Sequence, residues 1–202
     1  MKKIISVVGL SLCANAAVAA TETVENNVST LLFEASAGAD YSQFGLGIGI
    51  KPENNRSGFG GLYYEQIELE HHLKTNIKTL GFRGFSVEGV GEEARGADIT
   101  MGLSKTVSGD YKRTGFSARG LLHMPLFVNT TWFVGGDVRP TFLSFDWDND
   151  ALTELALQIG VDTRLAKNIG LYAKYYHESL ILDDFEEHRL GSGFVAGINV
   201  VW

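Results

Sequence analysis

The last ten residues, GFVAGINVVW (193–202), indicate how the rest of the chain folds. Apolar side chains occupy every second position up to the final residue, namely Phe194, Ala196, Ile198, Val200 and Trp202. A soluble domain usually ends in poorly ordered polar residues. Alternation with a period of two predicts a β-strand with one apolar face, and here that face continues to the last residue.

The same period of two recurs along the chain. In LLFEASAG (31–38) and YSQFGLGIGI (41–50), apolar side chains alternate with polar residues or glycine. Turn-like or charged stretches separate such segments. No later run approaches the roughly 18 apolar residues of a membrane helix. The pattern predicts ten strands, at residues 31–38, 41–50, 59–70, 76–88, 97–106, 114–126, 130–145, 152–165, 169–180 and 190–202.

The first residues predict an export signal. Lys2 and Lys3 precede an apolar stretch, and Ala17-Val18-Ala19 fits a cleavage site. We therefore expect residues 1–20 to be a signal peptide that is removed, and residues 21–202 to form a single domain. The one cysteine, Cys13, lies in the signal, so the predicted mature domain has neither disulfides nor thiol chemistry.

An exported chain of alternating strands can form a soluble barrel with apolar residues inside, or an outer-membrane barrel with apolar residues outside. The predicted strands are long enough to span a bilayer. Turns at FVNT (127–130) and AKN (166–168) are short, and we expect longer, charged loops at the opposite end. The sequence predicts an all-β fold, an antiparallel up-and-down transmembrane β-barrel with ten strands, or alternatively eight. Its expected location is the outer membrane of a Gram-negative bacterium.

The terminal strand also predicts partners. An alternating last strand that ends on an aromatic residue resembles the signal that the barrel-assembly machinery reads in outer-membrane proteins, so we expect that machinery to bind the strand ending at Trp202. Outer-membrane lipids and lipopolysaccharide are the other expected partners. The net charge of −7 argues against nucleic acid. Trp132, Tyr175 and Trp202 should face outward near strand ends.

Residues 138–176 carry a resemblance to a known family. A strand containing Pro140, an Asp-rich turn, a further strand, a short turn around Asn168 and the strand GLYAKYY follow one another. This succession resembles the YfaZ-like outer-membrane proteins. The resemblance implies an outer-membrane barrel and brings no catalytic residues to this chain.

Charged side chains on the predicted inner faces form the first candidate site. A barrel of eight to ten strands has a narrow interior that side chains fill, and buried opposite charges pair. We expect a structural network of salt bridges or a narrow, porin-like pore, with no enzymatic activity and no cofactor. The residues assigned to this lumen are Glu34, Glu68, Asp98, Arg119, Asp137, Arg139, Glu154, Asp162, Arg164 and Lys174.

The segment YYHESL (175–180) supports an alternative function. His177 and Ser179 stand two residues apart on the outward face, as in the His-x-Ser of lipid A 3-O-deacylase, which this segment resembles. A serine nucleophile needs a base, and the base needs an orienting acid, which Glu186 or Glu187 could supply. Leu180 departs from that family, which carries Asn there. A second alternative is a soluble periplasmic β-barrel that binds a ligand.

Three acids alternate in DWDND, at Asp146, Asp148 and Asp150, as they do in a calcium loop. Ala151 and Leu157 replace the glycine and glutamate that such a loop requires. We therefore expect a solvated loop that binds divalent cations weakly at most.

Overall fold

The computed structural model describes residues 27–52, 58–71, 73–88, 95–147, 150–166 and 168–202. The predicted signal peptide lies outside the described residues, and so does Asp148. Within the described part, no helix is long and apolar enough to cross a membrane.

Within the described ranges, eleven strands form one sheet. In chain order they are β1 (Asn27–Gly38), β2 (Tyr41–Pro52), β3 (Gly58–Glu70), β4 (Lys74–Glu88), β5 (Arg95–Ser108), β6 (Tyr111–Phe127), β7 (Thr130–Pro140), β8 (Ser144–Trp147), β9 (Ala151–Ala166), β10 (Ile169–Leu182) and β11 (Glu187–Val201).

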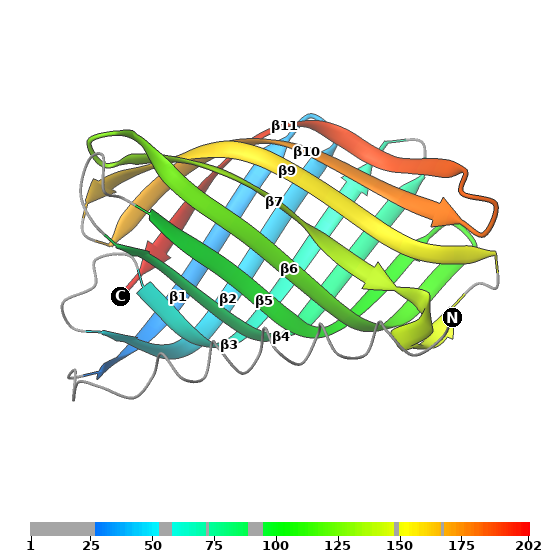
Figure 1. The fold of residues 1–202 in the computed structure, drawn as a ribbon, viewed down its shortest axis with the longest axis horizontal. Coiled ribbons are helices and arrows are strands. Elements are labelled where there is room, and N and C mark those ends of the chain that lie inside the picture. Colours follow the sequence, from blue (N-terminus) through cyan, green and yellow to red (C-terminus); the bar gives the residue numbers. More distant parts are fainter. Residues whose placement is uncertain (1–26, 53–57, 72, 89–94, 148–149, 167) are drawn as a thin grey trace, which may run out of the picture.

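The sheet closes on itself as an antiparallel barrel (Figure 1). Successive strands pair with each other from β1 to β7, and β7 then pairs with β9. β9 pairs with β10, β10 with β11, and β11 with β1, which closes the wall. The short β8 pairs only with β6, beyond the end of β7, so ten strands make up the wall. The predicted ten-stranded, up-and-down barrel is therefore confirmed.

The predicted strand 130–145 is wrong in one respect, because it is interrupted. β7 ends at Pro140, a single 3-10 turn follows over Thr141–Leu143, and β8 begins at Ser144. The turn is fixed on β9, because the Thr141 hydroxyl donates a hydrogen bond of 2.7 Å to the carbonyl of Leu152. β8 then continues along β6, where it pairs with Arg113–Gly115.

The expected difference in loop length between the two ends is largely absent. We call the end that carries Asn27 and Trp202 the terminal end, and the opposite end the distal end. The turns at 128–129 and 167–168 are short, as predicted. At the distal end, however, only the connection 141–150 is long. The strands there extend further than expected, and Gly109, with φ of 58°, allows β5 and β6 to meet in a tight turn.

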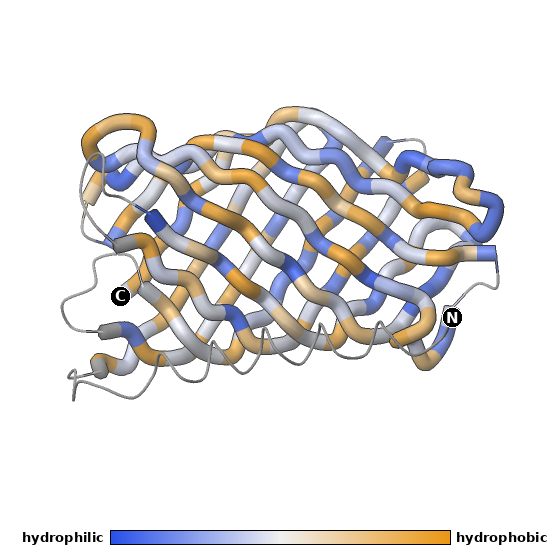
Figure 2. Tube along the Cα trace, in the orientation of Figure 1, coloured by the Kyte–Doolittle hydropathy of each residue, from blue (hydrophilic) through white to orange (hydrophobic). Residues whose placement is uncertain are grey.

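The two faces of the wall differ in polarity. Large apolar side chains point outward and are exposed, Phe82 and Phe194 among them at 67% and 79%. Charged and polar side chains alternate with them and are buried inside. Figure 2 shows this alternation of hydrophobic and hydrophilic residues along the strands. The distribution is the reverse of that in a soluble barrel, in which apolar side chains fill the interior.

The outward aromatic residues only partly follow the expectation. Trp132 lies on β7 near the terminal end of the barrel, between the buried Thr131 and Phe133. Trp202, the last residue, also lies at the terminal end of the barrel. Tyr175 instead lies in the middle of β10, where its ring packs against Phe194 at a centroid distance of 5.2 Å.

The C-terminal residue helps to close the barrel. The backbone of Trp202 exchanges two hydrogen bonds with Leu31, of 2.7 and 3.0 Å. The Thr30 hydroxyl donates another, of 2.7 Å, to the Trp202 carbonyl. Trp202 is therefore part of the wall.

Candidate functional site

The lumen, meaning the interior of the barrel, holds a network of buried charges. Each charged group stands on the inward face of a strand, since side chains alternate between the two faces. Seven carboxylates and five cations are buried among the described residues, namely Glu34, Glu65, Asp98, Asp137, Glu154, Asp162, Glu178, Arg83, Arg113, Arg119, Arg139 and Lys174.

Arg83 on β4 holds one part of this network. Its guanidinium forms salt bridges with Glu34 of β1 and Asp98 of β5, and the Nη2–Oδ2 distance to Asp98 is 2.7 Å. The Tyr63 hydroxyl donates a hydrogen bond of 2.7 Å to Glu34. The Tyr63 ring centroid also lies 4.8 Å from the Arg83 guanidinium carbon, within the range of a cation–π contact.

Arg119 on β6 connects opposite parts of the wall. Its two terminal nitrogens donate to Glu65 of β3, at 2.5 and 2.8 Å. Its Nε donates to Asp137 of β7 at 2.9 Å. Because β4 and β5 separate β3 from β6 in the sheet, this bidentate contact passes through the lumen and fixes non-adjacent strands relative to each other.

Arg139 on β7 lies next to this pair and is fully buried. It contacts Glu178 at 3.0 Å, Glu154 at 3.5 Å and Asp137 at 3.8 Å. Glu154 also accepts hydrogen bonds from the hydroxyls of Thr106 and Tyr111, at 2.7 and 3.0 Å. Nearly every buried carboxylate oxygen near Arg139 therefore has a donor, as a stable buried ion network requires.

Two cations lack a carboxylate partner within the described residues. The Lys174 ammonium donates to the side-chain oxygens of Gln43 and Gln158, at 3.2 and 3.1 Å. Arg113 donates to the Ser104 hydroxyl at 2.9 Å and to the Phe116 carbonyl at 2.5 Å. Both cations are held by neutral acceptors, so the interior combines ion pairs with dipoles. Among the described residues, the Nε atoms of Arg113 and Arg139 and the Thr100 hydroxyl are buried without a hydrogen-bond partner.

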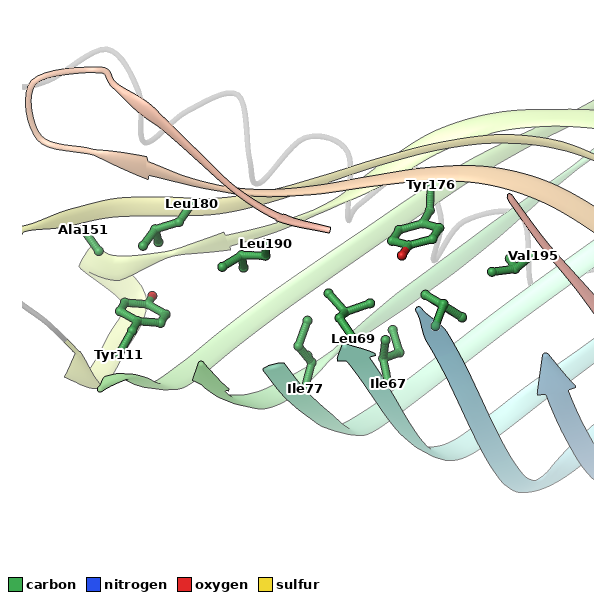
Figure 3. Packing of buried hydrophobic residues seen from close by; sticks show 10 residues of the cluster. Ile67, Leu69, Ile77, Tyr111, Ala151, Tyr176, Leu180, Leu190 and Val195 are labelled. Carbon is green, nitrogen blue, oxygen red and sulfur yellow. The ribbon is translucent and has the colours of Figure 1, made fainter. Parts of the chain in front are cut away.

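Apolar side chains close the lumen toward the distal end. Figure 3 shows Ile67, Leu69, Ile77, Tyr111 and Tyr176 pointing into the interior from opposite parts of the wall. The whole cluster, here called the distal plug, comprises Tyr41, Ile67, Leu69, Ile77, Tyr111, Ala151, Tyr176, Leu180, Leu190 and Val195. All ten side chains are buried, so little space remains for a solute at this level.

A small cavity lies within the charge network and toward the terminal end, where Glu34, Arg83, Asp98 and Arg119 of the network are among its lining residues. Its volume is about 60 Å³, and charged and amide side chains such as Asp162, Arg164, Lys174 and Asn199 line it. That volume holds a few water molecules, which need such polar partners. Among the described residues, the lumen therefore has a small cavity that could hold water and, toward the distal end, an apolar barrier.

The structure corrects one predicted lumen residue. Glu68 faces outward, where it accepts hydrogen bonds from Gln66 and Asn76 at 2.9 and 3.0 Å. Its neighbour Glu65 lies inside instead. The other nine predicted residues face the lumen, and Arg164 among them is half-buried at 20% side-chain exposure.

Four buried charges were missed by the sequence analysis: Glu65, Arg83, Arg113 and Glu178. Strict continuation of the alternation would have found Arg83, because Leu80 and Phe82 point outward and place Arg83 on the opposite face. Glu65 was obscured because β3 carries apolar residues on both faces, with Tyr63 and Ile67 inside and Leu62 outside.

The candidate hydrolase residues lie together at the distal rim. His177 Nε2 donates a hydrogen bond of 2.5 Å to Glu187, and this bond lowers the pKa of the Glu187 carboxyl below its ordinary value. Ser179 is only 2% exposed, and its hydroxyl donates to the Leu155 carbonyl at 3.4 Å. No described hydrogen bond joins Ser179 to His177. The acid and base are paired as predicted. The serine has no described hydrogen bond to the base and instead interacts with the Glu187 carboxylate, which also lowers the pKa of that carboxyl.

Glu186 and Leu180 do not contribute to this group. Glu186 lies in the turn after β10, where its backbone N–H donates to Asp184. Leu180 points inward and belongs to the distal plug.

The Asp-rich segment does not form a metal site among the described residues. Asp146 lies in β8 opposite Thr114, while the Asp150 carbonyl accepts a hydrogen bond of 3.0 Å from the backbone of Asp183. No group of three potential ligands is found within the part of the chain that the structure describes.

Comparison with known proteins adds little to this description. No protein-family model matches the sequence, and no curated protein matches it either. Among solved structures, the translocator domain of the autotransporter NalP from Neisseria meningitidis is similar at 12% identity and a TM-score of 0.33, over 97% of this chain and 95% of that domain. Values this low support no inference about function, and the resemblance to YfaZ-like proteins remains a prediction.

Proposed function

We propose that this chain is a structural outer-membrane β-barrel with a sealed lumen. The observation that carries the proposal is the distribution of side chains on a closed sheet, with exposed apolar residues outside and paired charges inside. A bilayer requires every backbone group of a spanning sheet to be paired, which only a closed barrel achieves. Asn27 and Trp202, the first and last described residues, lie at one end of the barrel with Trp202 in the wall, which fits assembly from the periplasm by the barrel-assembly machinery.

Membrane location is tested by fractionation of cells that express the full chain. The protein is expected in the Sarkosyl-insoluble membrane fraction, and its mobility on a denaturing gel should change when the sample is heated. Recovery as a soluble periplasmic protein would refute the proposal, and would favour the ligand-binding barrel.

The sealed lumen is tested in planar lipid bilayers with the purified, heat-modifiable protein. We expect no steady conductance, because the distal plug and the ion pairs fill the interior. The comparison is a variant with Leu69→Ser and Tyr176→Ser. Its conductance is expected to exceed that of the unaltered protein, because both residues belong to the plug. Steady unit conductance of the unaltered protein would instead support the narrow, porin-like pore.

The hydrogen bond between His177 and Glu187 is the specific observation that favours a second candidate, lipid A deacylation. The acid–base pair is in place, and a rotation of Ser179 away from Leu155 is what catalysis would further require. Lipopolysaccharide is incubated with membranes containing the protein or its Ser179→Ala variant, and lipid A is analysed by mass spectrometry. Loss of one acyl chain with the protein but not the variant would establish the hydrolase, and an unchanged lipid A would exclude it.

A further inference from the structure

The outer surface of β4, β5 and β6 carries lysines near the distal rim. Lys78 and Lys105 face outward and lie directly opposite each other in the ladder between β4 and β5. Lys112, also outward, lies diagonally from Lys105, which pairs with Thr114. Opposite residues on one face have Cβ atoms about 5 Å apart, and diagonal ones about 7–8 Å. The three ammonium groups can therefore reach one common point.

These three lysines lack a neutralising partner. Within the described residues none of them forms a salt bridge, in contrast to the neighbouring Lys74, which lies 3.9 Å from both Glu68 and Glu70. Like charges directly opposite each other in a sheet are destabilising. An anion bound between Lys78 and Lys105 would remove that repulsion.

The acidic residues closest to the lysines are engaged elsewhere or lie to the side. Glu68 accepts hydrogen bonds from Gln66 and Asn76, and Asp146 stands opposite Thr114 on β8. Asp110 lies in the turn between β5 and β6, near Lys112, but forms no salt bridge among the described residues. Glu70 pairs with Lys74, and Asp183, Asp184, Glu186 and Glu187 lie on the other side of the barrel, in or beside the turn between β10 and β11.

An apolar groove lies directly below the lysines, toward the middle of the wall. The next outward residue after Lys78 on β4 is Leu80, and the one before Lys105 on β5 is Leu103, and these two leucines pair with each other. The groove has a volume of about 520 Å³. Its lining includes Leu80, Phe82, Met101, Leu103, Phe116 and Leu143. Such an apolar surface suits hydrocarbon chains.

We propose that this surface binds an outer-leaflet phosphoglycolipid of the lipid A class, with a phosphate on Lys78, Lys105 and Lys112 and an acyl chain in the groove. The inference rests on the proposed function, which places this face in the membrane. This class of lipid matches both parts of the surface. Unpaired ammonium groups at the rim suit its phosphate, and the adjoining apolar groove suits its acyl chain.

The test measures lipid bound to the purified, heat-modifiable full-length barrel in detergent by native mass spectrometry. The probes are lipid A, the same lipid A without phosphates, phosphatidylglycerol and phosphatidylethanolamine. Lipid A should bind best. The double variant Lys78→Gln with Lys105→Gln should lower its affinity by roughly 30-fold, as expected for the loss of two charges at an anionic headgroup. A control with Lys51→Gln and Arg95→Gln, at the terminal end, should bind as the unaltered protein does.

A second variant tests the groove without changing charge. Ala118→Phe fills part of it, and should weaken binding of lipid A, whereas Ala173→Phe on the outer face of β10 should not. Equal binding of dephosphorylated lipid A or of phosphatidylglycerol would overturn the inference, as would unchanged binding by the lysine variant. A protein that lacks heat-modifiable mobility would overturn the proposed function, and this inference with it.

Discussion

Replacement of Arg119 by methionine is the perturbation that best tests the lumen network. Arg119 makes two hydrogen bonds to Glu65, at 2.5 and 2.8 Å, and two to Asp137, at 2.9 and 3.0 Å. After the substitution Asp137 keeps only the contact of 3.8 Å to Arg139. Glu65 keeps one neutral donor, the Gln43 amide at 2.6 Å, because the Tyr63 hydroxyl donates its single proton to Glu34.

Removal of one partner of a buried ion pair typically costs about 3–5 kcal/mol, because the charge left behind is uncompensated. At about 1.4 kcal/mol for each factor of ten, the folded fraction relative to the unfolded should fall by at least roughly 100-fold. The double variant with Arg119→Met and Glu65→Gln should recover part of the loss, since one of the two orphaned carboxylates, Glu65, is then neutral. Glu68→Gln, on the outer face, should change stability by less than about 0.5 kcal/mol.

The assay is reversible urea unfolding of the protein in lipid vesicles, followed by tryptophan fluorescence and by heat-modifiable gel mobility. The three variants are compared with the unaltered protein under one set of conditions. A cost below about 1 kcal/mol for Arg119→Met, or a cost equal to that of Glu68→Gln, would refute the view that the cross-lumen ion pair holds the barrel together.

Further predictions concern the wall, its last residue and the distal rim. A side chain at Gly45 would meet the Tyr63 hydroxyl at 2.4 Å, so Gly45→Val should destabilise by about 1–3 kcal/mol in urea unfolding. The outward Gly84 has nothing within 4 Å, so Gly84→Val is the matched control. Deletion of Trp202 removes two hydrogen bonds to Leu31 and should reduce the heat-modifiable fraction in membranes, and an undiminished fraction would contradict its role in closure. The lowered pKa of Glu187 stabilises the fold above the carboxyl's ordinary pKa of 4.5, so the stability difference from Glu187→Gln should begin to shrink below pH 4.5 and disappear as pH falls through the lowered pKa of the folded state. A difference that persists in acid would contradict this assignment.

Most strands could be predicted because period-two alternation reflects local backbone geometry. Each outward residue of the final strand, for example, was identified without knowledge of its neighbours. The interruption after Pro140 was missed because Pro140 is compatible with a strand end or an edge position, and which one applies depends on the partner strand. β3 was assigned to the wrong faces because both of its faces carry apolar side chains.

The lumen shows a similar division. Arg119 and Asp137 were placed inside by alternation alone, but sequence did not identify Glu65 as the other partner of Arg119. The distal plug was also missed. Its members, such as Leu69 and Tyr176, are apolar residues on inward faces, and an isolated strand cannot reveal that several such residues meet at one level of a barrel.

The sequence by itself determined the class of fold, because alternation, strand length and an apolar last residue are properties of consecutive residues. The tertiary structure decided which side chains meet, because strand register and barrel closure bring together residues far apart in the chain. The contact of Arg119 with Glu65, the packing of the distal plug and the juxtaposition of Lys78 with Lys105 all depend on that register. A shift of one residue would turn each of these side chains to the other face of the wall.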